Sequence, residues 1–270
     1  MVELFKKDKR ELNRQSSKGN QLKFFRDGIW YKADYLGYEG LSECVISKLL
    51  RYSDLSEEEY VDYTTEQISY NDNVYNGCRS EDFCKGWNLI TIERLFKQTC
   101  GYSLYKTMYE MSDKTERLRM MVSQVERITG ISDFGIYMSK MLAVDALFLN
   151  EDRHTHNIAV MTNDKKEFKL APIFDNGAGI LSDTTMEYGM GRDYFELIDK
   201  VRSKTFCDDF DEQLDIAEHL YGKQIGFHFG YREVKDIVDQ CDIYDDDVRK
   251  RAVDVIMQMR RKYEYLFVTI

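Results

Sequence analysis

The stretch from residue 138 to residue 176 constrains this chain more than any other part of it. It opens with an apolar run from Met138 to Leu149, which predicts a nearly all-buried helix that ends at Asn150. The charged cluster 151–157 follows at once. Because a buried helix leads straight into this cluster, the cluster must leave the hydrophobic core directly. An ordinary turn in solvent rarely follows directly on a fully buried helix.

A hairpin follows the charged cluster. Two strand-like runs, 158–161 and 168–171, flank the polar turn 162–166. If the turn centres near residues 164 and 165, antiparallel pairing sets residues near 154 opposite residues near 175. The hairpin therefore returns Asp175 to the loop that carries Asp152.

The residue types of this region suit the transfer of a phosphoryl group. Asp152 and Asn157 are five residues apart, the spacing between the catalytic-loop Asp and the metal-binding Asn of kinase-type sites. A carboxylate accepts or orients the proton of the attacking hydroxyl, and Mg²⁺ prefers hard oxygen ligands. We therefore predict Asp152 as the catalytic residue and Asn157 and Asp175 as metal ligands. The alternative is a pair of ordinary charged turns, in which Asp, Asn and Gly are common.

The run DRHTHN, the hairpin and the following Phe174-Asp175 resemble the HipA-like serine/threonine kinases of bacteria. Further motifs extend this resemblance in chain order over about residues 16 to 180. Residues 16–23 look like the family's short G-x-Q-x-K phosphate loop, residues 30–34 like the strand with its nucleotide-binding lysine, and residues 91–95 like its hinge. The chain starts almost at the phosphate loop, so we expect it to lack the N-terminal subdomain of full-length members.

The resemblance implies a two-lobed, protein-kinase-like α+β fold, with a small β-rich N-lobe and a larger, mainly helical C-lobe. It implies ATP and Mg²⁺ as cofactors and a protein substrate with a Ser or Thr acceptor, and it allows an antitoxin-like partner. Ser16 and Ser17, beside the phosphate loop, are the expected acceptors of self-phosphorylation. The residues implied in ATP binding are Gly19, Asn20, Gln21, Lys23, Lys32, Glu93, Leu95 and His154, with Glu93 and Leu95 offering backbone groups to adenine and His154 near the triphosphate.

Without the family, the N-terminal residues allow two interpretations. The runs 22–25 and 29–32 around Asp27-Gly28 predict a hairpin, which places Lys32 late on its second strand. Periodicity alone favours a solvent-facing Lys32, whereas a kinase-type site would use it to bind the α and β phosphates. Glu43, in a predicted helix over residues 40–51, either pairs with Lys32 or is a first-turn glutamate favoured by the helix dipole. Gly19 alone indicates only a turn.

Composition agrees with a globular two-lobed protein. The chain has 270 residues, enough for two lobes, and 43% of them are hydrophobic. Strands, one helix and loops are expected in an N-lobe of residues 1–95, which binds nucleotide phosphates. Helices are expected in a C-lobe of residues 96–270, which holds the catalytic loop and the metal site. The last predicted helix, from Val248 to Phe267, has the clearest apolar stripe.

Charge, hydropathy and cysteine usage argue against several classes of protein. The net charge of −10 argues against a nucleic-acid-binding surface. Neither a membrane-spanning run nor the apolar core of a secretory signal is visible, which predicts a soluble, cytoplasmic protein without a membrane partner. The six cysteines form no CxxC pair, so we expect reduced thiols rather than a zinc site or a disulfide framework.

Three alternatives to a protein kinase remain. A lipid or small-molecule kinase could share the metal machinery, because phosphoryl transfer depends on positioning and charge stabilisation more than on the acceptor. An enzyme of the aminoglycoside-phosphotransferase type is expected to show an HGD-led catalytic loop instead of the DRH of this chain. A catalytically silent pseudokinase could act as a binding module of a toxin–antitoxin system. The retention of Asp152, Asn157 and Asp175 weighs against this last alternative.

Overall fold

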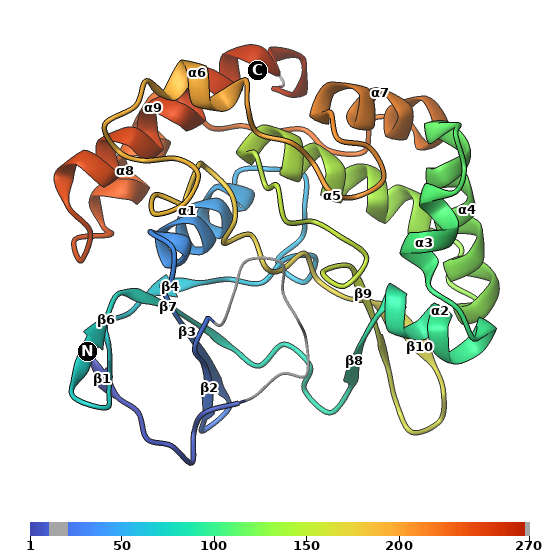
Figure 1. The fold of residues 1–270 in the computed structure, drawn as a ribbon, viewed down its shortest axis with the longest axis horizontal. Helices are drawn as coiled ribbons and strands as arrows, with labels where there is room; N and C mark the ends of the chain where they lie inside the picture. The colour runs from blue at the N-terminus through green and yellow to red at the C-terminus, as the bar shows by residue number, and fades with distance from the viewer. Residues whose placement is uncertain (11–20, 268–270) are drawn as a thin grey trace.

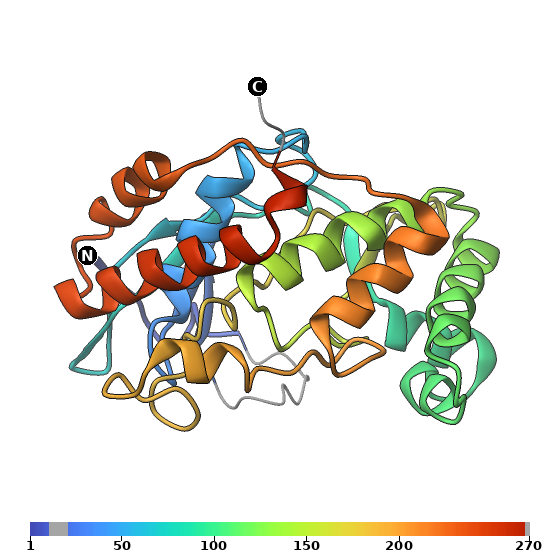
Figure 2. The same cartoon turned by 90° about the horizontal axis from the view of Figure 1, so that it is seen from above.

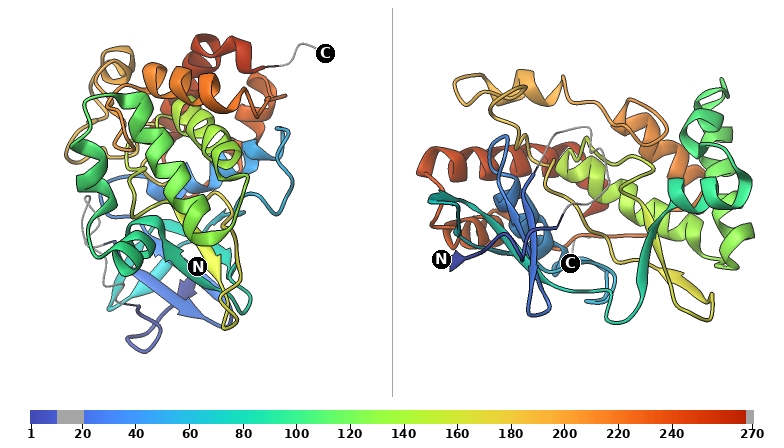
Figure 3. Two further views of the ribbon diagram at one scale, coloured as in Figure 1. Left: turned by 90° about the vertical axis from the view of Figure 1, so that its right-hand side faces the viewer. Right: turned by 60° about the horizontal axis from the view of Figure 1, so that its bottom comes forward.

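The structure is a computed structural model that describes residues 1–10 and 21–267. Most of its strands gather at one end of the molecule and most of its helices at the other (Figure 1; Figure 3, left). The strands are β1 (Val2–Glu3), β2 (Lys23–Arg26), β3 (Ile29–Ala33), β4 (Thr64–Thr65), β5 (Ile68–Tyr70), β6 (Asn73–Tyr75), β7 (Gly77–Glu81), β8 (Asn88–Thr91), β9 (Ala159–Thr162) and β10 (Phe168–Leu170). The helices are α1 (Glu39–Leu50), α2 (Ile92–Cys100), α3 (Leu104–Tyr109), α4 (Lys114–Thr129), α5 (Phe134–Phe148), α6 (Tyr194–Ile198), α7 (Phe210–Tyr221), α8 (Tyr231–Asp239) and α9 (Asp246–Lys262), followed by the short 3₁₀ helix η1 (Glu264–Leu266).

The sheet β2-β3-β7-β4 carries the predicted nucleotide-binding lysines. Strands β2 and β3 form the predicted hairpin, and Lys23 pairs with Lys32 across it. Asp27 and Gly28 in its turn both have positive φ, 52° and 78°, which a tight two-residue hairpin turn requires. This local prediction is confirmed. A second small sheet, β1-β5-β6, continues the strand-rich end of the molecule.

The hairpin of β9 and β10 follows the charged cluster, as predicted. Its register pairs Met161 with Lys169 and Val160 with Leu170, so the turn lies close to the expected place. Strand β8, which directly precedes α2, pairs with the other side of β9. The chain before α2 therefore joins the same sheet as the hairpin that leads to Asp175.

Helix α5 forms the centre of the core. Thirteen of its fifteen residues are buried, and Lys140 and Asp145 are its only charged residues. It packs against α4, α7 and α9 (Figure 2). A helix that is apolar all round is stable only when it is covered on all sides, which the surrounding helices provide. The predicted buried helix is confirmed, and it begins earlier than expected, at Phe134.

Helix α1 lies between the main sheet and the C-terminal helices, and it packs on β7 and on α8. Glycine permits its close approach, because a Cβ on Gly40 would lie 2.4 Å from the carbonyl carbon of Gly77. The approach brings the buried side chain of Glu43 toward Lys32 on the neighbouring strand β3.

The molecule is thus an α+β protein with a small strand-rich part and a larger helical part, as predicted. The predicted boundary between residues 95 and 96 falls inside α2, and as a domain boundary it stays a prediction. Among the described residues, none of the helices has the length and apolar character needed to cross a membrane.

Candidate active site

The loop that carries Asp152 begins where α5 ends. Leu149 adopts a left-handed conformation with φ 55° and ψ 41°, which stops the helix. Asn150 then turns back on the last turn of α5, since its N–H donates to the Asp145 carbonyl at 2.9 Å and its side-chain amide donates to Asp145 Oδ1 at 2.9 Å. Asp152 follows with only 9% of its surface exposed. The charged cluster therefore starts inside the core.

The buried side chain of Arg153 connects the segments that form the site. Its guanidinium is fully buried and bonds Asp145 through Nε to Oδ2 at 2.9 Å and through Nη2 to Oδ1 at 3.0 Å. Nη1 donates to the carbonyls of Phe174 at 2.6 Å and Asn157 at 3.2 Å, and Nη2 donates to Asn176 Oδ1 at 2.7 Å. One side chain thus connects α5, the loop and the segment that contains Asp175.

Asn157 lies against Asp152, as the predicted site requires. Its side-chain NH₂ donates to the Asp152 carbonyl at 2.8 Å and reaches Oδ2 of the same residue at 3.5 Å. This fixes the orientation of the amide, so Asn157 Oδ1 points away from Asp152. Within the described part of the chain, Oδ1 accepts no hydrogen bond, which leaves it available as a ligand.

Lys32, Glu43 and Asp175 form a second group. Lys32 Nζ donates to Asp175 Oδ1 at 2.8 Å and also to Glu43 Oε1. The other carboxylate oxygen of Glu43 accepts the Asn176 backbone N–H at 2.8 Å, so Glu43 holds both the lysine and the chain beside Asp175. The structure bears out the predicted pairing of Glu43 with Lys32, and the Lys32 side chain is only 12% exposed rather than solvent-facing. Phosphate binding by Lys32 stays a prediction. Tyr63 covers the lysine, with its ring centre 5.0 Å from Nζ.

The charges of this group reinforce one another. Burial alone would lower the pKa of Lys32, but the carboxylates of Asp175 and Glu43 outweigh it and raise that pKa well above the ordinary value. Burial would likewise raise the pKa of Asp175, but Lys23, Lys32 and Arg153 together hold it well below the ordinary value. Lys32 is therefore a cation and Asp175 an anion at neutral pH.

The donor set fits a nucleotide with a divalent cation. Asp175 offers an ionised carboxylate, and Asn157 an amide oxygen that accepts no hydrogen bond from residues 1–10 and 21–267; both are oxygen ligands of the kind that Mg²⁺ prefers. Asp175 has φ 61°, a strained conformation for a residue other than glycine, and such strain clusters at functional sites. His154 lies beside them with Nε2 3.9 Å from Asp152 Oδ1, and its buried Nδ1 has no partner in the described part of the chain.

The structure brings together one part of the predicted site and leaves another untested. Asp152, Asn157, His154, Lys32, Glu43 and Asp175 lie within the connected network described above. Lys23 lies opposite Lys32 on β2, close enough for its charge to act on Asp175, and Gln21 precedes that strand. Ser16, Ser17, Gly19 and Asn20 lie outside the described residues.

The residues predicted to form the hinge lie at the start of helix α2. Glu93 and Leu95 are buried in α2, which Thr91 caps by accepting the Arg94 N–H at 3.3 Å. The Glu93 N–H donates to the Thr155 carbonyl at 3.2 Å, and its carboxylate accepts Thr155 Oγ1 at 3.0 Å and the Tyr105 N–H at 2.9 Å. Glu93 therefore braces the loop that carries Asp152, and its N–H is bonded within the protein in this conformation. The adenine contacts predicted for the backbone of Glu93 and Leu95 stay predictions.

Four residues of the site have no role in the predictions made from the sequence: Arg153, Asp145, Tyr63 and Lys204. A single acid within the apolar run of α5 was a usable signal for Asp145, because a buried carboxylate needs a partner. Arg153, inside the DRH run, was the nearest candidate for that partner. Lys204 Nζ lies 3.8 Å from Asp152 Oδ1, and nothing in its sequence context indicates this.

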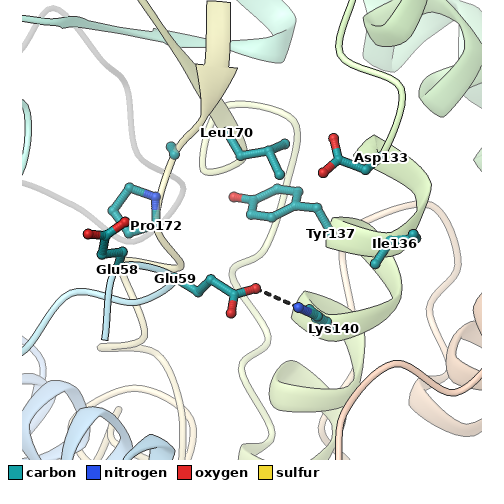
Figure 4. A pocket seen from close by; sticks show the side chains of 9 residues that line it. Glu58, Glu59, Asp133, Ile136, Tyr137, Lys140, Leu170 and Pro172 are labelled. Atoms are coloured by element: carbon teal, nitrogen blue, oxygen red, sulfur yellow. Dashed lines mark hydrogen bonds and ion pairs between the residues drawn. The ribbon is translucent and has the colours of Figure 1, made fainter. Parts of the chain in front are cut away.

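A pocket of about 100 Å³, partly open to solvent, lies between the N-terminal half of α5 and the chain after β10 (Figure 4). Its lining includes Tyr137, Pro172 and the ion pair of Lys140 with Glu59, whose Nζ and Oε1 are 2.5 Å apart. None of the predicted site residues lines it, so we do not assign the chemistry to it.

The remaining site expectations concern metals and thiols. Over residues 1–10 and 21–267, no three side chains of His, Cys, Asp or Glu gather as a metal site would require. All six cysteines are free thiols, as expected. A magnesium site of the predicted kind does not need such a cluster, because one carboxylate, one amide and phosphate oxygens would form it.

Comparisons with known proteins show the fold. No family model matches the sequence, and no curated protein matches it. Among solved structures, the chain is similar to the crystal structure of a Helicobacter pylori proinflammatory kinase, CtkA, with a TM-score of 0.65 and 15% sequence identity. The alignment covers 97% of this chain and 95% of that chain. The predicted two-lobed, kinase-like fold is therefore confirmed.

Proposed function

We propose that this protein is a Mg²⁺-dependent ATP phosphotransferase that phosphorylates a Ser or Thr hydroxyl of a protein and can phosphorylate itself. The observation that carries the proposal is that the Arg153 guanidinium bonds the carbonyls of Asn157 and Phe174. These bonds hold the loop of Asp152 and Asn157 beside the segment that contains Asp175. The kinase-like fold supports it. The resemblance to HipA-like kinases supports a protein hydroxyl as the acceptor.

Each side chain has a distinct role in this proposal. Asp152 accepts or orients the proton of the attacking hydroxyl, and Asn157 and Asp175 hold the cation. Lys32, kept charged by its two carboxylate neighbours, binds the α and β phosphates, and His154, beside Asp152, lies near the triphosphate. Bound Mg²⁺ would neutralise charge on the phosphates during transfer. Glu43 is a positioning residue, because it bonds Lys32 and the Asn176 N–H but no reacting atom.

The preformed ion pair of Lys32 and Glu43 favours an active enzyme over the pseudokinase alternative. A silent binding module has no need to keep a lysine charged beside two carboxylates, whereas phosphoryl transfer requires this pair to be in place. A lipid or a small molecule is the alternative acceptor that the experiment below distinguishes from a protein. An antitoxin-like partner belongs to the proposal only through the family resemblance.

The test is transfer of labelled phosphate from ATP in the presence of Mg²⁺, to the protein itself and to fractions of a cell lysate. We expect the wild type to label a protein band. Asp152→Asn should lower the rate about 100-fold or more, because it removes the base, yet still bind ATP. Replacing Ser16 and Ser17 with Ala should remove any label on the protein itself.

Each other outcome points to one alternative. Label found only in the lipid or small-molecule fraction would assign the enzyme to another acceptor class. A wild type that binds ATP but labels nothing would favour the pseudokinase. Equal transfer by wild type and Asp152→Asn would overturn the role of Asp152.

A further inference from the structure

Lys204 lies beside the predicted base, on the connection between α6 and α7. Its Nζ is 3.8 Å from Asp152 Oδ1, and its side chain is 39% exposed. This distance allows an electrostatic attraction but is too long for a hydrogen bond. Over the described residues, Nζ makes no hydrogen bond, so all three ammonium donors remain available beside the catalytic loop.

The backbone on both sides of Lys204 is fixed to the site. Thr205 is fully buried, and its Oγ1 donates to the Arg153 carbonyl at 2.6 Å, which ties the connection directly to the catalytic loop. Ser203 is also buried, with its N–H bonded to the Asp208 carbonyl at 3.1 Å and its Oγ to Gln213 Oε1 at 2.9 Å. Lys204 is thus a partly exposed cation on an anchored backbone, unlike an ordinary surface lysine.

The position of Lys204 complements that of the other cations. The charges of Lys23 and Lys32 lower the pKa of Asp175, which is a predicted metal ligand. Lys204 stands at the side of Asp152, where the acceptor hydroxyl would approach. During transfer, negative charge spreads over the three equatorial oxygens of the phosphoryl group, and a fixed cation there stabilises the transition state.

We propose that Lys204 is a further catalytic residue, whose ammonium donates hydrogen bonds to the oxygens of the phosphoryl group while that group moves to the acceptor. This rests on the proposed function. In the step, the acceptor hydroxyl oxygen forms a bond to the γ phosphorus, and the bond from that phosphorus to the β–γ bridging oxygen breaks. The electron pair leaves with ADP, the hydroxyl proton passes to Asp152, and Lys204 keeps its proton.

The experiment compares Lys204→Met, Lys204→Arg and the control Lys200→Met in the full chain. Lys200 lies four residues upstream on an exposed part of the same connection, and its side chain makes no hydrogen bond or ion pair within the described residues. We expect Lys204→Met to lower kcat about 100-fold with little change in the KM for ATP. Lys204→Arg should restore part of the loss, and Lys200→Met should match the wild type.

The readouts separate this proposal from a structural role and from the proposed function. A wild-type kcat in Lys204→Met would overturn it. So would a loss of kcat that Lys204→Arg does not restore and that comes with a lower melting temperature, because the lysine would then only support the fold. An inactive wild type overturns the function and the role of Lys204 together, whereas an active wild type with an unaffected Lys204→Met overturns the role of Lys204 alone.

Discussion

Among single side chains, Arg153 and its buried partner Asp145 determine the geometry of the site most. Both side chains are fully inaccessible to solvent, and the guanidinium bonds the backbone of two site segments as well as the acid. The motif DRHTHN predicted roles for Asp152 and Asn157 from chemistry and spacing. It contains Arg153 as well, but not the partners of its guanidinium, which lie on α5 and after β10, 8 and 21 residues away.

Asp145→Asn should destabilise the protein strongly. The substitution leaves the Arg153 charge without its counterion in the core, and breaking a buried pair in this way typically costs about 3–5 kcal/mol. We expect a free energy of unfolding lower by about 3 kcal/mol or more, measured by urea denaturation.

Lys140→Met is the matched control on the same helix. Lys140 also forms an ion pair, with Glu59, but both side chains are partly exposed, and such pairs contribute about 1 kcal/mol or less. If the two variants lost similar amounts of unfolding free energy, the buried pair would not be the more important one.

At the scale of elements, local signals were sufficient for most of the fold. The Asp-Gly turn predicted the β2–β3 hairpin, the polar turn predicted β9 and β10, and the apolar run predicted α5. The contacts of Glu93 at the start of α2 were not predictable in this way. Thr91 starts a helix there, and the Glu93 side chain finds its partners on Thr155 and Tyr105, contacts that depend on tertiary structure.

Asp34 connects three elements and gives a prediction about pH. It follows β3, accepts the Gly40 N–H of α1 at 2.6 Å, and accepts the Tyr244 hydroxyl from the α8–α9 connection at 2.8 Å. Burial, and then the negative charge of Glu39, raise the pKa of Asp34 to about 8. Folded protein therefore keeps a proton on Asp34 at neutral pH.

The sign of the pH dependence follows from this proton. Between about pH 4 and pH 8 the unfolded chain has lost the proton and the folded chain holds it, so the free energy of unfolding falls as the pH rises. Asp34→Asn removes this contribution, and its stability should fall less steeply with pH, by up to about 1.4 kcal/mol per unit. Urea denaturation from pH 5 to pH 8 measures the slope.

The exposed Asp72 serves as the control for Asp34, because it lies in the turn after β5 and makes no hydrogen bond within the described residues. Asp72→Asn should keep the wild-type slope. If Asp34→Asn keeps it too, Asp34 is not protonated in the folded protein at neutral pH.

At the scale of the molecule, the site exists only where the two parts of the fold meet. Lys32 comes from the strand-rich part, Asp152 and Asn157 follow the central helix of the other part, and Asp175 returns after the hairpin. The order of the motifs along the chain predicted this arrangement through its resemblance to a family. Periodicity alone favoured a solvent-facing Lys32, since it cannot report that α1 and the Asp175 segment close over that strand.

The most direct test of the central claim is the effect of Mg²⁺ on ATP affinity, measured by titration calorimetry in Mg²⁺ and in EDTA. If Asp175 and Asn157 hold the cation beside the nucleotide, Mg²⁺ should tighten ATP binding by the wild type about tenfold or more, equivalent to about 1.4 kcal/mol. Asp175→Asn should lose most of this gain, and the exposed control Asp164→Asn should keep it. Equal ATP affinity with and without Mg²⁺, or a full gain in Asp175→Asn, would contradict the account.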